Sequence, residues 1–549
     1  MLKLLSNVIL GIIEDNTGLF SYPRVYDVLA NIKLPLVAYP HDFIHLTYQS
    51  SQPIIWTLYF FLAKYIDVVF LYNLWIILSF VLTLIFSYIF IKIFVKNKPI
   101  SLLVSLVFTF SPYFYYSSRN HLDLMQFWLL ILFLIMFFGK NYRYKPLLLG
   151  FLAAVTLGVS NYIAYILLLF VGLHFVYSLD FLDSKKVCKF FAFMLSFLVF
   201  GLFILSPYLS LVRQGSSSAF PPSRTFEDFV TFSSKPWLFF LPPVDNPIFG
   251  SLSTHVINTL AEKWGYFWTA NYFKSEHSTN YMGIVNSVFA VIGLVSLKKY
   301  SYEERKPFYI LALIIISLAL LSLPPVATVF GINLYLPSFL LFKVFPMFRV
   351  LSRLNVLSLL LALIFTGLGY TRLIAKYGKS KSTYLCISFL FVLSLCEFFV
   401  PFKGVDVSSP PEVYSFLKEL PGGPMAVYPY SKANEALYWL SEYNKPLMNP
   451  RNYASTDGAF TSEKFTKNLA SEKGLLEFEE LGGTYIVYFY NADKDPVNAS
   501  KFFDSNSLLE KVIVMDHTAP DLKLINPFIS IADASSTYSN SAIIYRFKR

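Results

Sequence analysis

The residues best suited to chemistry lie in the stretch Ser111 to Leu124, SPYFYYSSRNHLDL. It places Arg119, His121 and Asp123 within five residues of one another, inside a region that is otherwise apolar from Pro53 to Phe138. Charged side chains are costly to hold in hydrocarbon, so the stretch is predicted to be a short turn at a membrane surface between two spanning helices. It could form one wall of an active site, or an ordinary polar hairpin.

A second group of polar residues, His41, Asp42 and His45, follows Pro40. A histidine pair at i and i+4 could bind a divalent cation if the segment is helical, and proline is common at the start of a helix. No third ligand is identified, whereas zinc sites in proteins use at least three protein ligands. We therefore expect no metal here, and the cofactor requirement stays open.

The composition indicates an integral membrane protein, in which these polar groups need spanning helices to position them. Of 549 residues, 55% are apolar and only 14% are charged, whereas soluble domains carry about 25% charged residues. The net charge of +11 lies on the apolar part, because residues 404–549 hold 14 Lys and Arg against 18 Asp and Glu. A nucleic-acid partner is therefore not expected.

The apolar part, residues 1–403, is predicted to be a bundle of about 10–11 spanning helices. Spanning segments are expected near 68–91, 99–111, 123–138, 146–160, 162–179, 187–210, 282–297, 307–323, 354–371 and 383–401, with an interfacial helix at 53–67. Residues 1–13 are expected to be the end of a first spanning helix.

Basic residues predict which loops face the cytoplasm. Seventeen Lys and Arg fall in the five loops around residues 92–98, 140–145, 185–189, 298–306 and 372–381, against four in the intervening short loops. The positive-inside rule then sends loops 14–52, 212–281 and 324–353 to the outer side, together with residues 404–549. Within 324–353, the apolar stretch Leu336 to Phe348 is too short to span and predicts a re-entrant or surface-lying helix.

Residues 404–549 are predicted to form an extracytoplasmic α/β domain. Helices are expected at 410–420 and 475–481, and strands at 425–428, 485–490 and 542–547. Short apolar strands that alternate with helices suggest a small sheet covered by helices. No nucleophile elbow, phosphate loop or metal motif occurs in it, so we expect an accessory domain that binds or orients a substrate.

Four stretches together resemble the GT-C superfamily of polytopic membrane glycosyltransferases, in particular bacterial and archaeal members with a C-terminal outer domain. They are FSPYFYYSSRNHLDLMQFW (110–128), TNYMG (279–283), PMFRVLSRLN (346–355) and LEFEELGGTYIVY (476–488). The chain departs from that group's pattern at Asn120, which replaces a glycine before His121, and between Arg349 and Arg353, where a proline is absent.

The resemblance implies a transferase at the outer face of the plasma membrane that takes a sugar from a polyprenyl-phosphate donor. The acceptor would be a glycan, a lipid or a protein. In GT-C enzymes an acid in the first outer loop removes the acceptor's proton, and Asp15 occupies that place, with Glu14 and Asp27 as rivals. A carboxylate that merely ends a helix is the other interpretation of Asp15.

Cations must hold the charge of the departing lipid phosphate, and the candidates are Arg119, His121, Arg349 and Arg353. Arginine suits phosphate because its fork can donate two parallel hydrogen bonds. Arg349 and Arg353 could instead reach lipid headgroups from an interfacial helix.

Two other classes of protein are alternatives. A transporter or flippase usually shows internal repeats and buried charges along a pathway, whereas here the spanning segments carry few charges and polarity collects on one side. A non-catalytic membrane assembly protein is the third class, against which the acids and arginines of the outer loops argue mildly.

Overall fold

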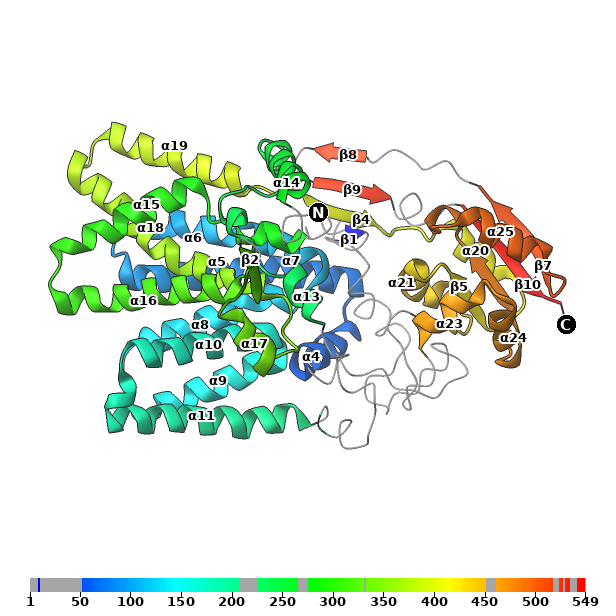
Figure 1. Ribbon diagram of the computed structural model, residues 1–549, viewed down its shortest axis with the longest axis horizontal. Coiled ribbons are helices and arrows are strands. Elements are labelled where there is room, and N and C mark those ends of the chain that lie inside the picture. Colours follow the sequence, from blue (N-terminus) through cyan, green and yellow to red (C-terminus); the bar gives the residue numbers. More distant parts are fainter. Residues whose placement is uncertain are drawn as a thin grey trace.

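A computed structural model describes residues 8–9, 52–206, 209, 225–264, 275–329, 332–450, 461–516, 523–526, 529–533 and 541–548. A bundle of helices occupies one end of the molecule and a smaller α/β unit the other (Figure 1). This arrangement confirms the predicted class, a helical membrane protein with a C-terminal α/β domain.

The bundle consists of helices, most of which match predicted spanning segments. They are α4 (Pro53–Ala63), α5 (Val68–Phe94), α6 (Lys98–Thr109), α7 (Pro112–Asn120), α8 (Trp128–Phe138), α9 (Lys145–Val159), α10 (Asn161–Tyr177), α11 (Ser184–Ile204), α15 (Ile284–Ser296), α16 (Tyr302–Ser322), α18 (Asn355–Tyr377) and α19 (Lys381–Phe398). In the described part of the chain, seven helical stretches are long and apolar enough to cross a membrane, and four apolar helices are shorter. The protein is thus a multi-pass membrane protein.

Helix α18 forms the centre of the bundle, because most of its residues from Asn355 to Tyr370 are buried. It packs closely on α15 through two glycines. A Cβ atom at Gly293 would lie 1.9 Å from the carbonyl oxygen of Phe365, and one at Gly369 would lie 2.1 Å from that of Phe289. Small residues that allow backbones to approach are the usual means of helix association in membranes, where lipid is as apolar as the helices.

The stretch that was predicted to be a short turn is a helix instead. Residues Pro112–Asn120 form α7, which continues α6 after a kink at Ser111, and the two helices together make one candidate span, Lys98–Arg119. The prediction was wrong because Pro112 occupies the first helical position, where its missing N–H costs nothing. The rings of Tyr113 and Phe114 are buried in the bundle, which stabilises the helix in spite of the polar residues that follow.

Short elements cover the end of the bundle that faces the α/β unit (Figure 1). They are η1 (Leu124–Phe127), α13 (Phe226–Thr231), η4 (Pro236–Phe239), α14 (Gly250–Trp264), η6 (Ser275–Asn280), the hairpin β2 (Val326–Val329) with β3 (Ile332–Tyr335), α17 (Ser338–Val344) and η8 (Leu351–Leu354). Leu340 and Val344 of α17 are exposed, as expected for a helix that lies on the surface.

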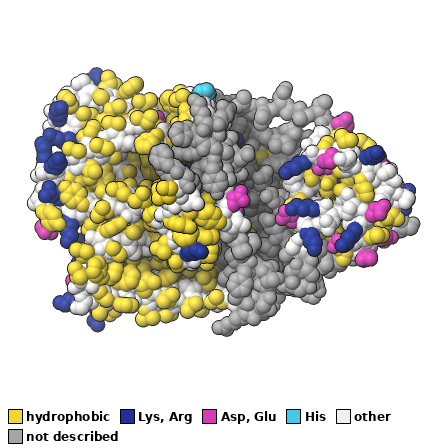
Figure 2. Space-filling view, viewed as in Figure 1, with side chains coloured by type: hydrophobic (Ala, Val, Ile, Leu, Met, Phe, Trp, Pro, Cys, Tyr) yellow, Lys and Arg dark blue, Asp and Glu magenta, His cyan; other side chains and the backbone are white. Residues whose placement is uncertain are grey.

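Lys and Arg side chains gather at the opposite end of the bundle, far from the α/β unit (Figure 2). The loops between α8 and α9, α10 and α11, α15 and α16, and α18 and α19 all lie at that end (Figure 1). The structure therefore places the basic loops and the C-terminal domain at opposite ends of the bundle, as the charge pattern predicts. Hydrophobic side chains cover the surface between them (Figure 2).

The C-terminal domain has a four-stranded sheet in the order β5 (Met425–Tyr428), β6 (Tyr485–Tyr488), β10 (Ala542–Phe547) and β7 (Leu509–Met515). Strands β5 and β6 are parallel, and β10 is antiparallel to both β6 and β7. The helices that surround the sheet are α20 (Glu412–Glu419), α21 (Ala433–Tyr438), α22 (Leu440–Tyr443), α23 (Ser462–Leu469), α24 (Glu472–Glu480) and α25 (Pro496–Ser505). The predicted strands at 425–428 and 542–547 are present with those bounds.

A second sheet lies beside the bundle and joins distant parts of the chain. Its order is β1 (Val8–Ile9), β4 (Phe402–Asp406), β9 (Ile529–Asp533) and β8 (Lys523–Asn526). Strand β4 follows α19 directly and pairs in parallel with β9. Residues near the end of the chain thus return to the junction between the bundle and the C-terminal domain (Figure 1), which the sequence analysis did not anticipate.

Candidate active site

Arg353 and His121 form the centre of the candidate site. Nη2 of Arg353, in η8, lies 3.1 Å from Nε2 of His121, which follows α7. The Arg353 guanidinium also lies over the Tyr162 ring, 4.5 Å from its centroid, an attractive position for a cation. Arg353 is buried. Of the four predicted cations, the structure brings these two together.

This geometry fixes the protonation of His121. A guanidinium only donates hydrogen bonds, so Nε2 of His121 must accept, and the imidazole is neutral with its proton on Nδ1. Burial, and then the charge of Arg353, lower the pKa of His121 to about 3. His121 therefore supplies no positive charge of its own and instead orients the Arg353 fork.

Asp123 adds a carboxylate two residues beyond His121. Its Oδ2 accepts hydrogen bonds from Oγ of Ser160 at 2.8 Å and from Nε2 of Gln52 at 3.2 Å. Burial raises the pKa of Asp123, against the lowering effects of the Ser160 hydrogen bond and the Arg353 charge. The sequence analysis placed Asp123 in the polar stretch without assigning it to the site. The only sign in the sequence that Asp123 belongs to the site was its position two residues after His121.

Arg353 has no carboxylate within ion-pair distance among the described residues. A buried guanidinium attracts an anion where bulk water does not hydrate its charge, and no described carboxylate forms an ion pair with Arg353. The candidate site therefore consists of Arg353, His121 and Tyr162, with Asp123 nearby.

The other two arginines are paired elsewhere. Nη1 of Arg349 lies 3.1 Å from Oδ1 of Asp228, and its guanidinium lies over the Phe232 ring. Both charged side chains are roughly one-third exposed. This ion pair ties the segment before η8 to helix α13, so Arg349 has a structural partner already.

Arg119 belongs to the junction with the C-terminal domain. Its Nη1 lies 2.8 Å from Oδ2 of Asp245, and its Nη2 donates to the carbonyl oxygen of Pro401. Lys403 of β4 is 4.0 Å from the same carboxylate oxygen. Burial raises the pKa of Asp245, but the hydrogen bond and charge of Arg119 outweigh it, so the net pKa is lowered.

The next residue, Asn246, strengthens this junction. Its Nδ2 lies within hydrogen-bond distance of the carbonyl oxygens of Cys396, Glu397 and Phe399, at the end of α19. Its Oδ1 accepts from two backbone N–H groups in its own loop. The orphan carbonyls of a helix C-terminus thus find a side-chain partner, which the sequence analysis missed because the two segments are 150 residues apart.

Two of the stretches that carry the GT-C resemblance meet at Asn355. Its Nδ2 donates to Oδ1 of Asn280 at 2.7 Å, and also lies 2.8 Å from Oγ of Ser234 and 2.9 Å from Oγ of Ser322. Asn280 lies in TNYMG and Asn355 ends PMFRVLSRLN. With the contact between Arg353 and His121, three of the four stretches converge on one end of the bundle, while LEFEELGGTYIVY lies in the C-terminal domain.

The predicted acids Asp15, Glu14 and Asp27 lie outside the described residues, as do the metal candidates His41, Asp42 and His45. Among the residues that the structure does describe, no group of three or more His, Cys, Asp or Glu could hold a metal ion.

Three solved structures are similar to this chain, and the first of them shares this arrangement of helices. Arabinofuranosyltransferase AftD from Mycobacteria superposes with a TM-score of 0.56 at 12% identity, over 100% of this chain and 39% of that chain. The oligosaccharyltransferase AglB from Archaeoglobus fulgidus gives 0.43 at 10% identity, over 91% of this chain and 68% of that one. ArnT from Cupriavidus metallidurans gives 0.40 at 11% identity, over 99% and 94%.

The comparison with AftD defines the fold class of the protein. The protein has the GT-C fold, as the resemblance predicted, and it spans about two-fifths of the length of the AftD chain. No curated protein sequence matches the chain. Residues 32–398 match the family described as "Domain of unknown function (DUF6311)", and the chain belongs to that family.

Proposed function

We propose that this protein is a membrane glycosyltransferase that moves a sugar from a polyprenyl-phosphate donor to an acceptor at the outer face of the plasma membrane. The observation that carries the proposal is the buried Arg353 guanidinium, which faces a neutral histidine rather than a carboxylate. A lipid phosphate would supply the anion that balances this charge.

In the proposed reaction an acceptor hydroxyl attacks the anomeric carbon of the sugar. The bond from that carbon to the phosphate oxygen breaks, and the electron pair leaves with the lipid phosphate. Arg353 binds this phosphate and stabilises the charge that develops on it. His121 would hold the guanidinium in place, because its Nε2 accepts one N–H and no other described residue forms a hydrogen bond with the Arg353 side chain.

Asp15 is proposed to take the proton of the acceptor hydroxyl, with Glu14 and Asp27 as alternatives. Asp123 is proposed to hold the turn after His121 in position through its hydrogen bonds to Ser160 and Gln52. The sidedness rests on the basic loops, which lie at the end of the bundle far from the α/β unit (Figure 2). The acceptor is a glycan, a lipid or a protein.

The test is release of polyprenyl phosphate from a panel of polyprenyl-phosphate sugars by the purified full-length protein. Asp15→Asn keeps the size of the side chain but removes the proton acceptor, so it should lower the rate by roughly a hundredfold or more. Glu14→Gln and Asp27→Asn should retain most of the activity. Full activity in Asp15→Asn with loss in either of the other two would move the base to that residue. Unchanged rates in all three variants would contradict all three candidate bases, and no release by the wild type would contradict the transferase.

A further inference from the structure

The C-terminal domain contains a cavity that the proposed chemistry does not use. It lies between helices α23 and α24 and has a volume of about 410 Å³, within the range of about 300–1,000 Å³ that ligand pockets occupy. Eight residues line it: Thr461, Lys464, Phe465 and Asn468 from α23 and the residue before it, and Lys473, Leu476, Glu477 and Glu480 from α24.

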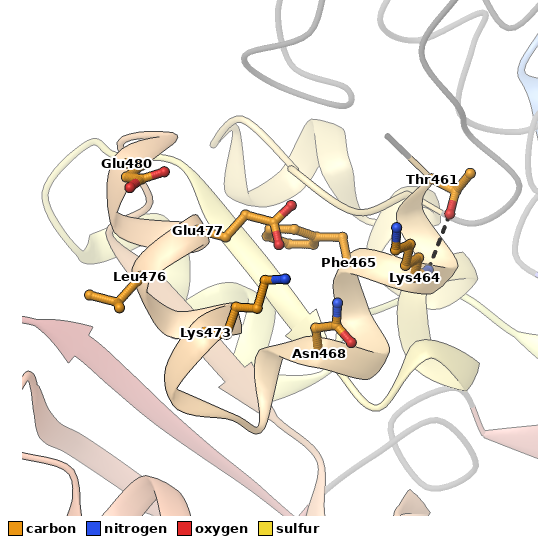
Figure 3. A pocket seen from close by; sticks show the side chains of 8 residues that line it. All are labelled: Thr461, Lys464, Phe465, Asn468, Lys473, Leu476, Glu477 and Glu480. Carbon is orange, nitrogen blue, oxygen red and sulfur yellow. Dashed lines mark hydrogen bonds between the residues drawn. The ribbon is translucent and has the colours of Figure 1, made fainter. Parts of the chain in front are cut away.

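Polar side chains from the two helices converge on this cavity. Lys473 and Glu477 reach from α24 toward α23, where Lys464 and Asn468 lie opposite them (Figure 3). Phe465, which is buried, closes the space behind these polar groups (Figure 3). The cavity thus combines an apolar floor with hydrogen-bonding groups on two walls.

These polar groups have unused hydrogen-bonding capacity. In the described part of the chain, no side-chain hydrogen bond or ion pair engages Lys464, Asn468, Lys473 or Glu477. On another face of α23, by contrast, Lys467 and Glu463 form an ion pair at 2.6 Å. The side chains at the cavity therefore stay available for a ligand, while a pair of the same residue types outside it is already engaged.

The chemistry of the lining selects the class of ligand. Two lysines are balanced by Glu477 and Glu480, so the cavity carries no net charge and does not favour a phosphate or a polyanion. Ammonium groups and the amide N–H₂ donate, while the carboxylates and the amide oxygen accept. A sugar hydroxyl both donates and accepts, so a neutral chain of sugars can use both kinds of partner at once. A peptide that binds by strand addition needs an exposed strand edge, and two helices offer none.

We infer that the cavity between α23 and α24 binds a neutral oligosaccharide. The assignment of that oligosaccharide as the acceptor, or as part of it, rests on the proposed function. Glu477 and Asn468 bind hydroxyl groups from opposite walls, and the two lysines donate at the rim. The C-terminal domain would then hold a glycan acceptor while its reactive end reaches the bundle.

The test measures binding rather than turnover. Saturation-transfer-difference NMR on the full-length protein in lipid nanodiscs would use maltopentaose, chitopentaose, xylopentaose and mannopentaose as neutral probes. Pentagalacturonate and a Gly-Ser peptide of similar size serve as comparators. At least one neutral probe should bind, and Glu477→Ala and Asn468→Ala should each weaken it roughly two- to tenfold, as expected for the loss of one or two hydrogen bonds.

The matched control is Glu463→Ala, which removes a carboxylate from the same helix outside the cavity and should leave binding unchanged. The inference is overturned if no neutral probe binds, if the double variant Glu477→Ala/Asn468→Ala binds as well as the wild type, or if pentagalacturonate or the peptide binds best. Arg353→Ala separates the two proposals, because it should abolish lipid-phosphate binding and leave oligosaccharide binding intact. Oligosaccharide binding without any lipid-phosphate binding would overturn the proposed function alone.

Discussion

Arg353 and His121 are 232 residues apart in the chain, yet their side-chain nitrogens lie 3.1 Å from each other. The contact joins the start of α18, the most central helix, to the end of α7. A guanidinium that meets a neutral imidazole rather than a carboxylate keeps its charge available. This contact distinguishes Arg353 from Arg119 and Arg349, which form ion pairs with Asp245 and Asp228.

The low pKa of His121 predicts a pH-dependent stability. The folded pKa of about 3 lies below the ordinary value of 6.5, so between these values the unfolded chain binds a proton that the folded protein does not. Stability should be fully present above pH 6.5 and fall as the pH drops toward 3, by up to about 1.4 kcal/mol per pH unit. Thermal unfolding in detergent from pH 7 to pH 4 measures this effect.

The variant His121→Asn keeps a hydrogen-bond acceptor but cannot titrate. Its stability should therefore fall less steeply with decreasing pH than that of the wild type. Identical pH dependence in the two proteins would show that His121 is not held neutral in the folded protein.

The junction of Arg119 with Asp245 predicts a structural role for Asp245, a residue of the outer loop 212–281 that the sequence analysis did not single out. Asp245→Asn should lower the free energy of unfolding by about 1.5–3 kcal/mol, because the largely buried Arg119 loses its charged partner. The control is Asp180→Asn, whose partner Lys186 is half exposed, and there the loss should stay below about 1 kcal/mol. Chemical unfolding of both variants in the same detergent makes the comparison, and equal losses would contradict it.

The spanning segments could be predicted from the sequence because a helix in lipid must be long and apolar, and both properties are local. The kink at Ser111 and helix α7 could not, because polar residues near Arg119 indicated a turn, whereas burial of Tyr113 and Phe114 stabilised a helix. At this place the packing of buried side chains outweighed the local sequence pattern.

The site was predictable only in part, for a related reason. Arginine and histidine could be recognised as ligands for phosphate by type, so Arg353 and His121 were both named. Their mutual contact, and the pairing of Arg119 with Asp245, depend on segments that meet only after folding. Asn246 and Asn355 were missed on the same account, since a lone asparagine in a sequence gives no sign that it will bond three carbonyls or three side chains.

The charge pattern predicts the orientation of the protein in the membrane. Lys186 lies in the first turn of α11, at the basic end of the bundle, and Lys494 lies in the C-terminal domain; both are exposed. Cysteine introduced at Lys494 should react with a membrane-impermeant reagent in intact cells, while cysteine at Lys186 should react only after permeabilisation. Equal labelling at the two positions in intact cells would contradict the outward placement of the site.

The most direct measurement of the central claim is the mass spectrometry of lipids that stay bound to the purified full-length protein. The wild type should carry polyprenyl phosphate, and Arg353→Ala should lose at least roughly tenfold of it, because a charge-assisted contact to the phosphate is removed. Arg353→Lys should retain an intermediate amount, since one charge remains while the fork is lost. Arg143→Ala is the control, because Arg143 also lies over a tyrosine ring but in an exposed loop at the basic end, and it should retain the wild-type amount. If the wild type carries no polyprenyl phosphate, or if Arg353→Ala carries as much as the wild type, Arg353 does not bind a lipid phosphate and the account is wrong.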